Sequence, residues 1–244
     1  MSRIVVTGAS SGLGLAICKE LLGYGHTVYG FDKFDAKEPI DRIRDSHYHL
    51  KMGDVRSKVD IESAFEHLGG VDIVINCVGV NCIDFLEDIE QKDWDRLLDT
   101  NAMSILFTSQ IFRKRLKESA GTILNITSNA SHMPMTSSLA YNASKAAADI
   151  MTKQLARELF PRHGITVFGI APNKLSGTGM SDYIDNRVPE MRGWTFEEAK
   201  EYQLKGLAIG EETPPEALAQ FIAHLLQDKY HHKYFHGCII PFGL

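Results

Sequence analysis

The chain has 244 residues, of which 44% are hydrophobic and 23% are charged. These are ordinary values for a globular protein, and the length suffices to bury one sizeable core. A formal net charge of −5 provides no basic surface of the kind that binds nucleic acid. We find neither an apolar run near the roughly 20 residues that span a bilayer nor a signal peptide, so we expect a soluble cytoplasmic protein without a membrane partner.

The four cysteines form no CxxC pair and have no metal-ligand spacing with histidine. Free thiols in a reducing compartment are therefore expected. The histidine-rich stretch HHKYFH (231–236) has no closed ligand set, so we interpret it as a surface turn before the last strand. The sequence predicts no metal site.

Short apolar runs alternate along the chain with longer amphipathic segments, and many of the runs are apolar at consecutive positions. Such runs are typical of strands that are buried on both faces of a parallel sheet. Strands are expected at 3–7, 27–31, 47–52, 72–76, 121–127, 165–171 and 238–241. Helices are expected at 12–24, 57–68, 90–117, 140–160 and 214–227. This alternation predicts an α/β fold: a single-domain, Rossmann-like, doubly wound parallel sheet with helices on both faces.

Residues 173–213 interrupt this alternation with a stretch rich in Gly, Pro, Met and charge. We expect it to be irregular, apart from a short helix over 195–204. A segment of this length inside a compact domain is usually functional. It is interpreted as a lid or substrate-binding loop.

A glycine-rich turn follows the first expected strand and opens the first helix. Its glycines are Gly8, Gly12 and Gly14. Glycine lets the backbone turn sharply and approach a pyrophosphate, whose charge the helix N-terminus favours. The turn therefore predicts a nucleotide site.

Asp32 ends the second expected strand, about 20 residues beyond the glycines, where a carboxylate can accept hydrogen bonds from the adenosine ribose. A carboxylate there repels a 2′-phosphate, so NAD(H) is the preferred cofactor. Lys33 leaves NADP(H) possible, because it can pair with a 2′-phosphate if Asp32 swings away. After the third strand, Asp54 is placed to accept a bond from the adenine amino group, beside the backbone of Val55.

Tyr141 and Lys145 lie four residues apart in the stretch AYNASKAAA, on the same face of a helix. Tyrosine normally titrates near a pKa of about 10, and a nearby ammonium lowers that value by stabilising the phenolate. An oxidised nicotinamide ring would add a second positive charge. Tyr141 is thereby predicted to exchange a proton with an alcohol or a carbonyl oxygen.

Two further polar residues complete the expected reaction centre. Ser128 ends the fifth strand, and its hydroxyl can donate a hydrogen bond to a substrate carbonyl or alkoxide. Asn101 lies in a helical segment, where an amide side chain can hold water or bend the helix locally.

Together, TGASSGLG (7–14), NCVG (76–79), Asn101, Ser128 and YNASK (141–145) resemble the short-chain dehydrogenase/reductase family. The resemblance runs from residue 3 to about 172. It implies a seven-stranded parallel sheet, usually in homotetramers or homodimers. It also implies that Tyr141 is the general acid/base, that Lys145 lowers its pKa and binds the nicotinamide ribose, that Ser128 polarises the carbonyl, and that Asn101 holds a water of a proton relay.

The expected cofactor contacts follow from the same motifs. They are Gly8, Ser10, Ser11, Gly12, Leu13, Gly14, Asp32, Asp54, Val55, Asn76, Val78, Gly79, Tyr141, Lys145, Pro172 and Thr178. Ser176 rivals Thr178 as the residue that holds the nicotinamide amide. The chain departs from the family pattern at Asn173, Cys77 and the C-terminal CIIPFGL, which puts cofactor closure and substrate class in question.

Apolar and aromatic side chains near these motifs are candidates for the substrate pocket, although for any one of them core packing is the safer interpretation. The candidates are Val80 to Cys82, His132, Met133, Met135, Met180, Tyr183, Arg187, Met191, Arg192 and Trp194. Arg187 or Arg192 could pair with a carboxylate or phosphate of the substrate, although such arginines are more often solvated.

The leading hypothesis is an NAD(H)-dependent oxidoreductase that interconverts a secondary alcohol and a ketone. One alternative is an NADPH-dependent 3-oxoacyl or sugar-type reductase. An alternative from another class is a nucleotide-sensing binding protein without turnover, which has no need of all four catalytic candidates.

Overall fold

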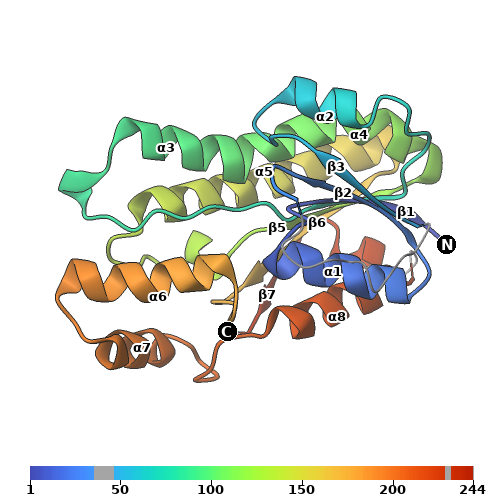
Figure 1. Ribbon diagram of the computed structural model, residues 1–244. Helices are drawn as coiled ribbons and strands as arrows, with labels where there is room; N and C mark the ends of the chain where they lie inside the picture. Colours follow the sequence, from blue (N-terminus) through green and yellow to red (C-terminus); the bar gives the residue numbers. More distant parts are fainter. Residues whose placement is uncertain (36–46, 229–231, 244) are drawn as a thin grey trace.

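The computed structural model describes residues 1–35, 47–228 and 232–243, apart from the side chains of 117–119. Its centre is a parallel seven-stranded sheet in the order β3-β2-β1-β4-β5-β6-β7 (Figure 1). The strands are β1 (Arg3–Thr7), β2 (Thr27–Asp32), β3 (Tyr48–Met52), β4 (Ile73–Asn76), β5 (Thr122–Ile126), β6 (Thr166–Pro172) and β7 (Ile239–Phe242). The doubly wound sheet predicted from the sequence is confirmed.

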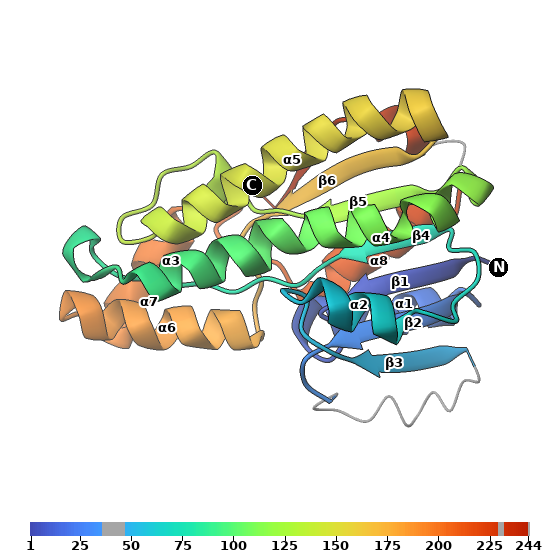
Figure 2. The same ribbon diagram turned by 90° about the horizontal axis from the view of Figure 1, so that it is seen from above.

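Helices cover both faces of this sheet (Figure 2). The helices are α1 (Gly12–Gly23), α2 (Lys58–Ala64), α3 (Gln91–Leu98), α4 (Ser104–Ser119), α5 (Leu139–His163), α6 (Gly179–Arg192), α7 (Phe196–Lys205) and α8 (Pro215–Leu226). Short 3-10 turns are η2 (Leu86–Asp88), η4 (Asn129–Ser131) and η5 (Lys233–Phe235), and a π turn, η3 (Asp99–Met103), joins α3 to α4. Helices α1 and α8 lie on one face, and α2, α4 and α5 lie on the other (Figures 1 and 2).

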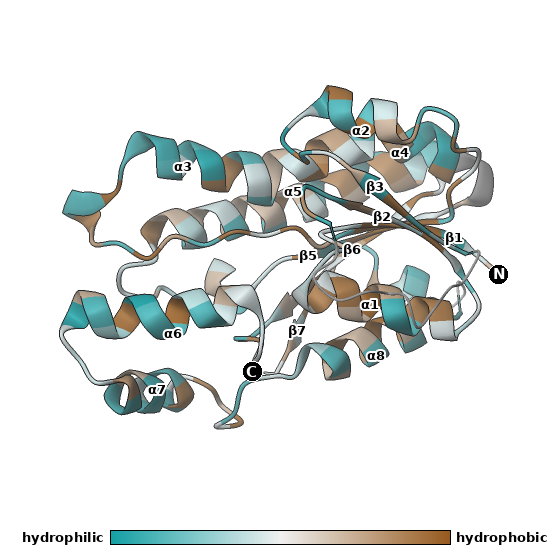
Figure 3. Ribbon diagram, in the orientation of Figure 1, coloured by the Kyte–Doolittle hydropathy of each residue, from teal (hydrophilic) through white to brown (hydrophobic). Residues whose placement is uncertain are grey.

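Successive residues of a strand pack on opposite faces of the sheet. Ile4 and Val6 of β1 pack into the cluster that includes α1 and α8, whereas Val5 packs into the cluster with Phe112 of α4 and Ala156 of α5. Successive side chains of a strand point to opposite faces, so burial on both faces requires consecutive apolar residues. This is why the strands form the hydrophobic centre of the molecule (Figure 3).

Helices α6 and α7 lie beyond the sheet, on the side where the strands end (Figure 1). The expectation of one short helix in an irregular 173–213 segment was therefore incomplete: α7 matches it closely, but α6 was missed. Thr178 caps the start of α6 by accepting a hydrogen bond from the Ser181 amide, and Gly193 ends it at a φ of 66°. Pro189 inside α6 obscured the helical pattern.

The histidine-rich stretch before β7 serves packing within the described residues. His232 is buried and lies 3.1 Å from the Thr122 hydroxyl, and His236 accepts a hydrogen bond from the Val167 amide. His231 lies outside the described residues. In the part of the chain that the structure describes, no three His, Cys, Asp or Glu side chains gather to hold a metal, and no helix is long and apolar enough to cross a membrane.

Candidate active site

The glycine turn after β1 is shaped for a close backbone approach. Gly8 and Gly12 adopt φ values of 73° and 50°, in the left-handed region that favours glycine. A Cβ on Gly14 would lie 1.9 Å from the Gly8 carbonyl oxygen, so only glycine fits where α1 meets the turn. Ser11, the N-cap of α1, makes no side-chain cap hydrogen bond in the described structure. The first amides of α1 are thus suited to a phosphate.

Asp32 fastens this turn to the end of β2. Its Oδ2 accepts a hydrogen bond from the Ser10 amide at 3.0 Å, and its Oδ1 accepts from the amides of Lys33 and Phe34. The Ser10 hydroxyl donates to the Phe34 carbonyl at 2.6 Å. Asp32 lines a cavity of about 1170 Å³, whereas Ser10 does not. Ser10 therefore shapes the turn from behind, and three amides hold the Asp32 carboxylate in place.

Asp54 also lines the cavity, after β3, but its oxygens are engaged by cations. Arg56 donates to it at 2.6 Å, and the Lys33 ammonium lies 3.4 Å away. The hydrogen bonds from Arg56 hold the pKa of Asp54 far below its usual range. Its proposed contact with adenine stays a prediction, and it competes with Arg56 for the same oxygens.

The segment at the end of β4 contains one structural residue, Asn76, and residues that line the cavity. Asn76 is buried and ties three elements together, since it donates to Asn125 of β5 at 2.8 Å and accepts from Thr108 of α4 at 2.9 Å. Val78 and Gly79 line the cavity, and Asn76 does not. A Cβ on Gly79 would lie 3.3 Å from the Lys145 Nζ, so this glycine keeps space open beside the lysine.

Ser128, Tyr141 and Lys145 line the same cavity as the glycine turn. Ser128 lies just after β5, while Tyr141 and Lys145 lie in the first two turns of α5. The Lys145 Nζ donates to the Ile126 carbonyl at 3.2 Å and lies 6.0 Å from the centre of the Tyr141 ring. The structure thus brings together around one cavity the three residues that the sequence analysis proposed for one reaction centre.

The electrostatics of this trio differ from expectation. Burial raises the pKa of Tyr141, and interaction with the Ser128 hydroxyl opposes that rise. Lys145 is not among the influences on the phenol; burial lowers the pKa of the lysine itself to about 8. Tyr141 and Lys145 are only 7% and 4% exposed, so loss of solvation dominates the pKa of each group. The lowered phenol pKa predicted from the sequence is therefore absent from the protein without cofactor.

Asn101 lies in the π turn between α3 and α4, where the helix deviates as its mid-helix amide suggested. Its Oδ1 accepts from the Val80 amide, and its Nδ2 donates to the Val80 carbonyl and the Ser144 hydroxyl, all at 2.8 to 2.9 Å. Asn101 does not line the cavity. The side chain joins the chain after β4 to α5, and its role in a water relay stays a prediction.

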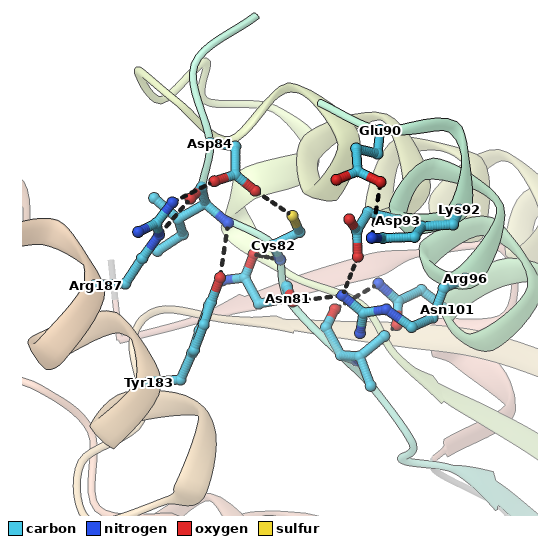
Figure 4. A network of polar contacts seen from close by, with 12 residues as sticks. Asn81, Cys82, Asp84, Glu90, Lys92, Asp93, Arg96, Asn101, Tyr183 and Arg187 are labelled. Atoms are coloured by element: carbon cyan, nitrogen blue, oxygen red, sulfur yellow. Dashed lines mark hydrogen bonds and ion pairs between the residues drawn. The ribbon is translucent and has the colours of Figure 1, made fainter. Parts of the chain in front are cut away.

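Helix α6 is attached to the chain after β4 by a polar clamp (Figure 4). The Tyr183 hydroxyl accepts from the Ile83 amide at 3.1 Å. Arg187 donates to the Ile83 carbonyl at 3.3 Å and to Asp84 at 2.6 Å. Arg187, a sequence candidate for substrate binding, therefore has a structural partner instead.

The remaining candidates divide by position. Those that line the cavity are Gly8, Ser11, Gly12, Leu13, Gly14, Val55, Val80, Asn81, Met133, Met135, Pro172, Thr178, Met180 and Arg192. Those that do not are Cys82, His132, Ser176, Tyr183, Arg187, Met191 and Trp194. The methyl of Thr178 would lie 3.4 Å from a Cβ on Gly12, so Thr178 faces the glycine turn, and its contact with the nicotinamide amide stays a prediction.

Sequence reasoning missed several cavity-lining residues. Phe34, Arg56 and Arg96 are exposed or half-exposed, and Gln203 lies on a helix whose orientation the sequence did not give. The available signal was for α6: a threonine cap and a glycine fourteen residues after the first helical residue resemble ordinary helix ends.

A glycine cradle, a carboxylate at the end of β2 and a Ser/Tyr/Lys trio lie around one cavity, the arrangement expected of a nucleotide-dependent oxidoreductase. The chain matches the short chain dehydrogenase family over residues 2–188 and belongs to that family. It is therefore an oxidoreductase that acts on CH–OH or C=O groups, and its family uses a nicotinamide cofactor.

Relatives match nearly the whole chain. L-2,3-butanediol dehydrogenase of Corynebacterium glutamicum is 30% identical over 242 residues, with 93% of each chain covered. Sorbitol-6-phosphate 2-dehydrogenase of Klebsiella pneumoniae is 28% identical over 240 residues, which cover 91% of this chain and 88% of the relative. The crystal structure of a short chain dehydrogenase family protein from Francisella tularensis shares the fold, with a TM-score of 0.87 at 24% identity over 99% of this chain and 96% of the other.

Proposed function

We propose that the chain catalyses the NAD(H)-dependent interconversion of a secondary alcohol and a ketone, with Tyr141 as general acid/base. The supporting observation is that Ser128, Tyr141 and Lys145 line one cavity together with the glycine turn. When bound, the nicotinamide cofactor accepts a hydride from the carbinol carbon or returns one to the carbonyl carbon. The names of the relatives, which include a butanediol dehydrogenase, agree with this class of substrate.

In the oxidative direction, Tyr141 acts as the phenolate and takes the hydroxyl proton as the hydride leaves, so the alcohol loses a proton and a hydride and becomes the ketone. Ser128 donates a hydrogen bond to the substrate oxygen and holds it near the phenol. Because the pKa of Lys145 is about 8, most of the side chain is an ammonium at pH 7, and it stabilises the phenolate that accepts the proton. Asn101 acts in this proposal by fixing Val80 and Ser144, and through them the approach to Lys145.

The NAD(H) preference is supported by the fixed position of Asp32. Swinging this carboxylate aside for a 2′-phosphate would break its hydrogen bonds with three amides, from Ser10, Lys33 and Phe34. A second candidate, an NADPH-dependent reductase, is favoured by Lys33 and Arg56, two cations at the same end of the cavity. Titrating the protein with NADH and NADPH decides between them: tighter binding of NADPH rejects our interpretation of Asp32.

Tyr141→Phe tests the catalytic proposal. We expect turnover to fall by about 10²-fold or more, as is usual on loss of a general acid/base, while the Kd of the cofactor stays within about twofold of wild type. The rate is followed by absorbance of the reduced nicotinamide with a panel of secondary alcohols and ketones. Undiminished turnover in the variant refutes the role of Tyr141, and a wild type that binds cofactor without turning over any substrate favours a nucleotide sensor.

We further propose that residues 1–244 form one catalytic domain, since the two largest hydrophobic clusters are built on one sheet. A homo-oligomer, either a dimer or a tetramer, is supported by Ile150, which is 63% exposed on α5. Light scattering after size exclusion tests the oligomer, and cell fractionation tests the expected cytoplasmic location.

A further inference from the structure

Arg192, the last residue of α6, lines the cavity and makes no hydrogen bond or ion pair with the described residues. Its guanidinium lies 4.7 Å from the Trp194 ring centre and 5.0 Å from that of Tyr202, so two aromatic faces fix its plane. Its Nε is buried without a hydrogen-bond partner among the described residues. A buried charged donor is costly unless an acceptor reaches it, so this group is suited to an incoming anion.

A second donor faces the same space. The Gln203 Nε2 is buried and has no hydrogen-bond partner in the described structure, while the Oε1 of that side chain accepts from Lys174. Gln203 also lines the cavity. Two donors without acceptors on adjoining elements indicate a missing acceptor-rich group.

The charged side chains of the cavity wall also favour an anionic ligand. Its carboxylates among the described residues are Asp32 and Asp54, both at the cofactor end beside β2 and β3. Other cations toward the substrate end have carboxylate partners: Lys174 with Glu212, Lys205 with Glu201, and Arg96 with Asp93. Arg192 has no such partner among the described residues, so its charge is available to a ligand.

The length of α6 separates this group from the reaction centre. Met180, in the first turn of α6, lies 4.0 Å from the Tyr141 hydroxyl, and Arg192 is twelve residues further on. Twelve helical residues span about 18 Å, and helical side chains lean toward the N-terminus, so the two groups lie on the order of 10–18 Å apart. The wall between them includes Met135, Ile184 and Val188, which are apolar.

We infer that the substrate is an elongated secondary alcohol or ketone with a terminal anionic group, a carboxylate or a phosphate monoester, which Arg192 binds. This inference rests on the proposed function and specifies its substrate. Arg192 and Gln203 would supply the hydrogen bonds to the anion, and the apolar wall would contact the chain between the two ends. Short alcohols, and uncharged ones of any length, would lack one set of contacts.

The test measures binding by calorimetry, separately from turnover. The ligands are the (ω−1)-hydroxy acids with 6, 8, 10 and 12 carbons, their methyl esters, and the phosphate monoesters of the matching diols, titrated with saturating NAD⁺ into protein carrying Tyr141→Phe. Because Tyr141→Phe blocks the proposed chemistry, the heat measured by calorimetry comes from binding alone. Arg192→Gln and Arg192→Lys are compared on the same background. Arg162→Gln, at an exposed position in the last turn of α5, controls for the loss of one positive charge.

We expect the acids with 10 or 12 carbons to bind at least about tenfold more tightly than their esters, a preference that Arg192→Gln removes and Arg162→Gln preserves. Arg192→Lys retains part of it, which distinguishes lost charge from misfolding. The stronger of the carboxylate and phosphate arms identifies the anion. Equal binding of acids and esters, a preference that survives Arg192→Gln, or a preference for the shortest acids overturns the inference. Loss of turnover in Tyr141→Phe would leave the proposed function standing in each of those cases.

Discussion

Lys145→Met is expected to make the folded protein more stable at neutral pH, although it removes a proposed catalytic group. Burial lowers the pKa of Lys145 to about 8, from about 10.4 in water. Below pH 8 the lysine is charged in both the folded and unfolded states, and the folded state bears a desolvation cost of about 3 kcal/mol. The variant also loses the hydrogen bond to the Ile126 carbonyl, a loss of about 1 kcal/mol. The net gain at pH 7 is therefore about 2 kcal/mol.

The sign of this effect should reverse with pH. As pH rises from about 8 to about 10.4, the unfolded state holds the extra proton, so the stability of the wild type rises relative to the variant. Above that range only the lost hydrogen bond remains, and the variant is the less stable by about 1 kcal/mol. Urea unfolding followed by circular dichroism at several pH values between 7 and 10.5 measures the difference.

Lys153→Met is the matched control, because Lys153 is exposed on the same helix. Its effect should show no such crossover. If Lys145→Met destabilises the protein at pH 7, or if its effect is the same at both ends of the pH range, then Lys145 is not held as a desolvated base, and our reasoning on its ammonium fails.

Two further substitutions probe the cradle and the clamp. In Gly14→Ala the new Cβ would lie 1.9 Å from the Gly8 carbonyl oxygen, so the turn must shift, and we expect cofactor affinity to fall on the order of tenfold or more. Gly23→Ala is the control, because Gly23 has open space around it. Its cofactor Kd, measured by fluorescence titration, should be unchanged. Arg187→Leu would leave Asp84 half-buried without its cation, and we expect a loss of about 1–3 kcal/mol in urea unfolding, most of which a second change, Asp84→Asn, should restore.

The strands and the reaction centre were predictable because their physical requirements are local. Strands buried on both faces need consecutive apolar residues, and the predicted span 3–7 matches β1. The pairing of Tyr141 and Lys145 needs only helical spacing. Each of these signals lies within a few residues of the chain.

Asn101 indicated a local bend in the predicted helix over 90–117, but the contacts that produce the π turn there are distant in sequence. Asn101 is held in the π turn by the backbone of Val80, twenty-one residues earlier, and by Ser144, forty-three residues later. Nor could the sequence separate Arg187 from Arg192 as anion-binding candidates. Arg187 has an acid partner 103 residues away, and only the fold brings Asp84 to it.

The cavity has two parts, one around the strand ends and one formed by α6 and α7, and different interactions stabilise them. The chemical half is built from strand ends, glycine geometry and the start of α5, where few residue types fit. The half formed by α6 and α7 has a small apolar cluster and depends on buried ion pairs, in which Lys174 contacts both Asp185 and Glu212. Buried ion pairs fix an arrangement more than they add stability, and either acid or base can come from many positions. Substitutions in α6 and α7 can thus change the lining of the cavity while the arrangement of Ser128, Tyr141 and Lys145 stays intact, which is why the motifs indicate the class of reaction and not the substrate.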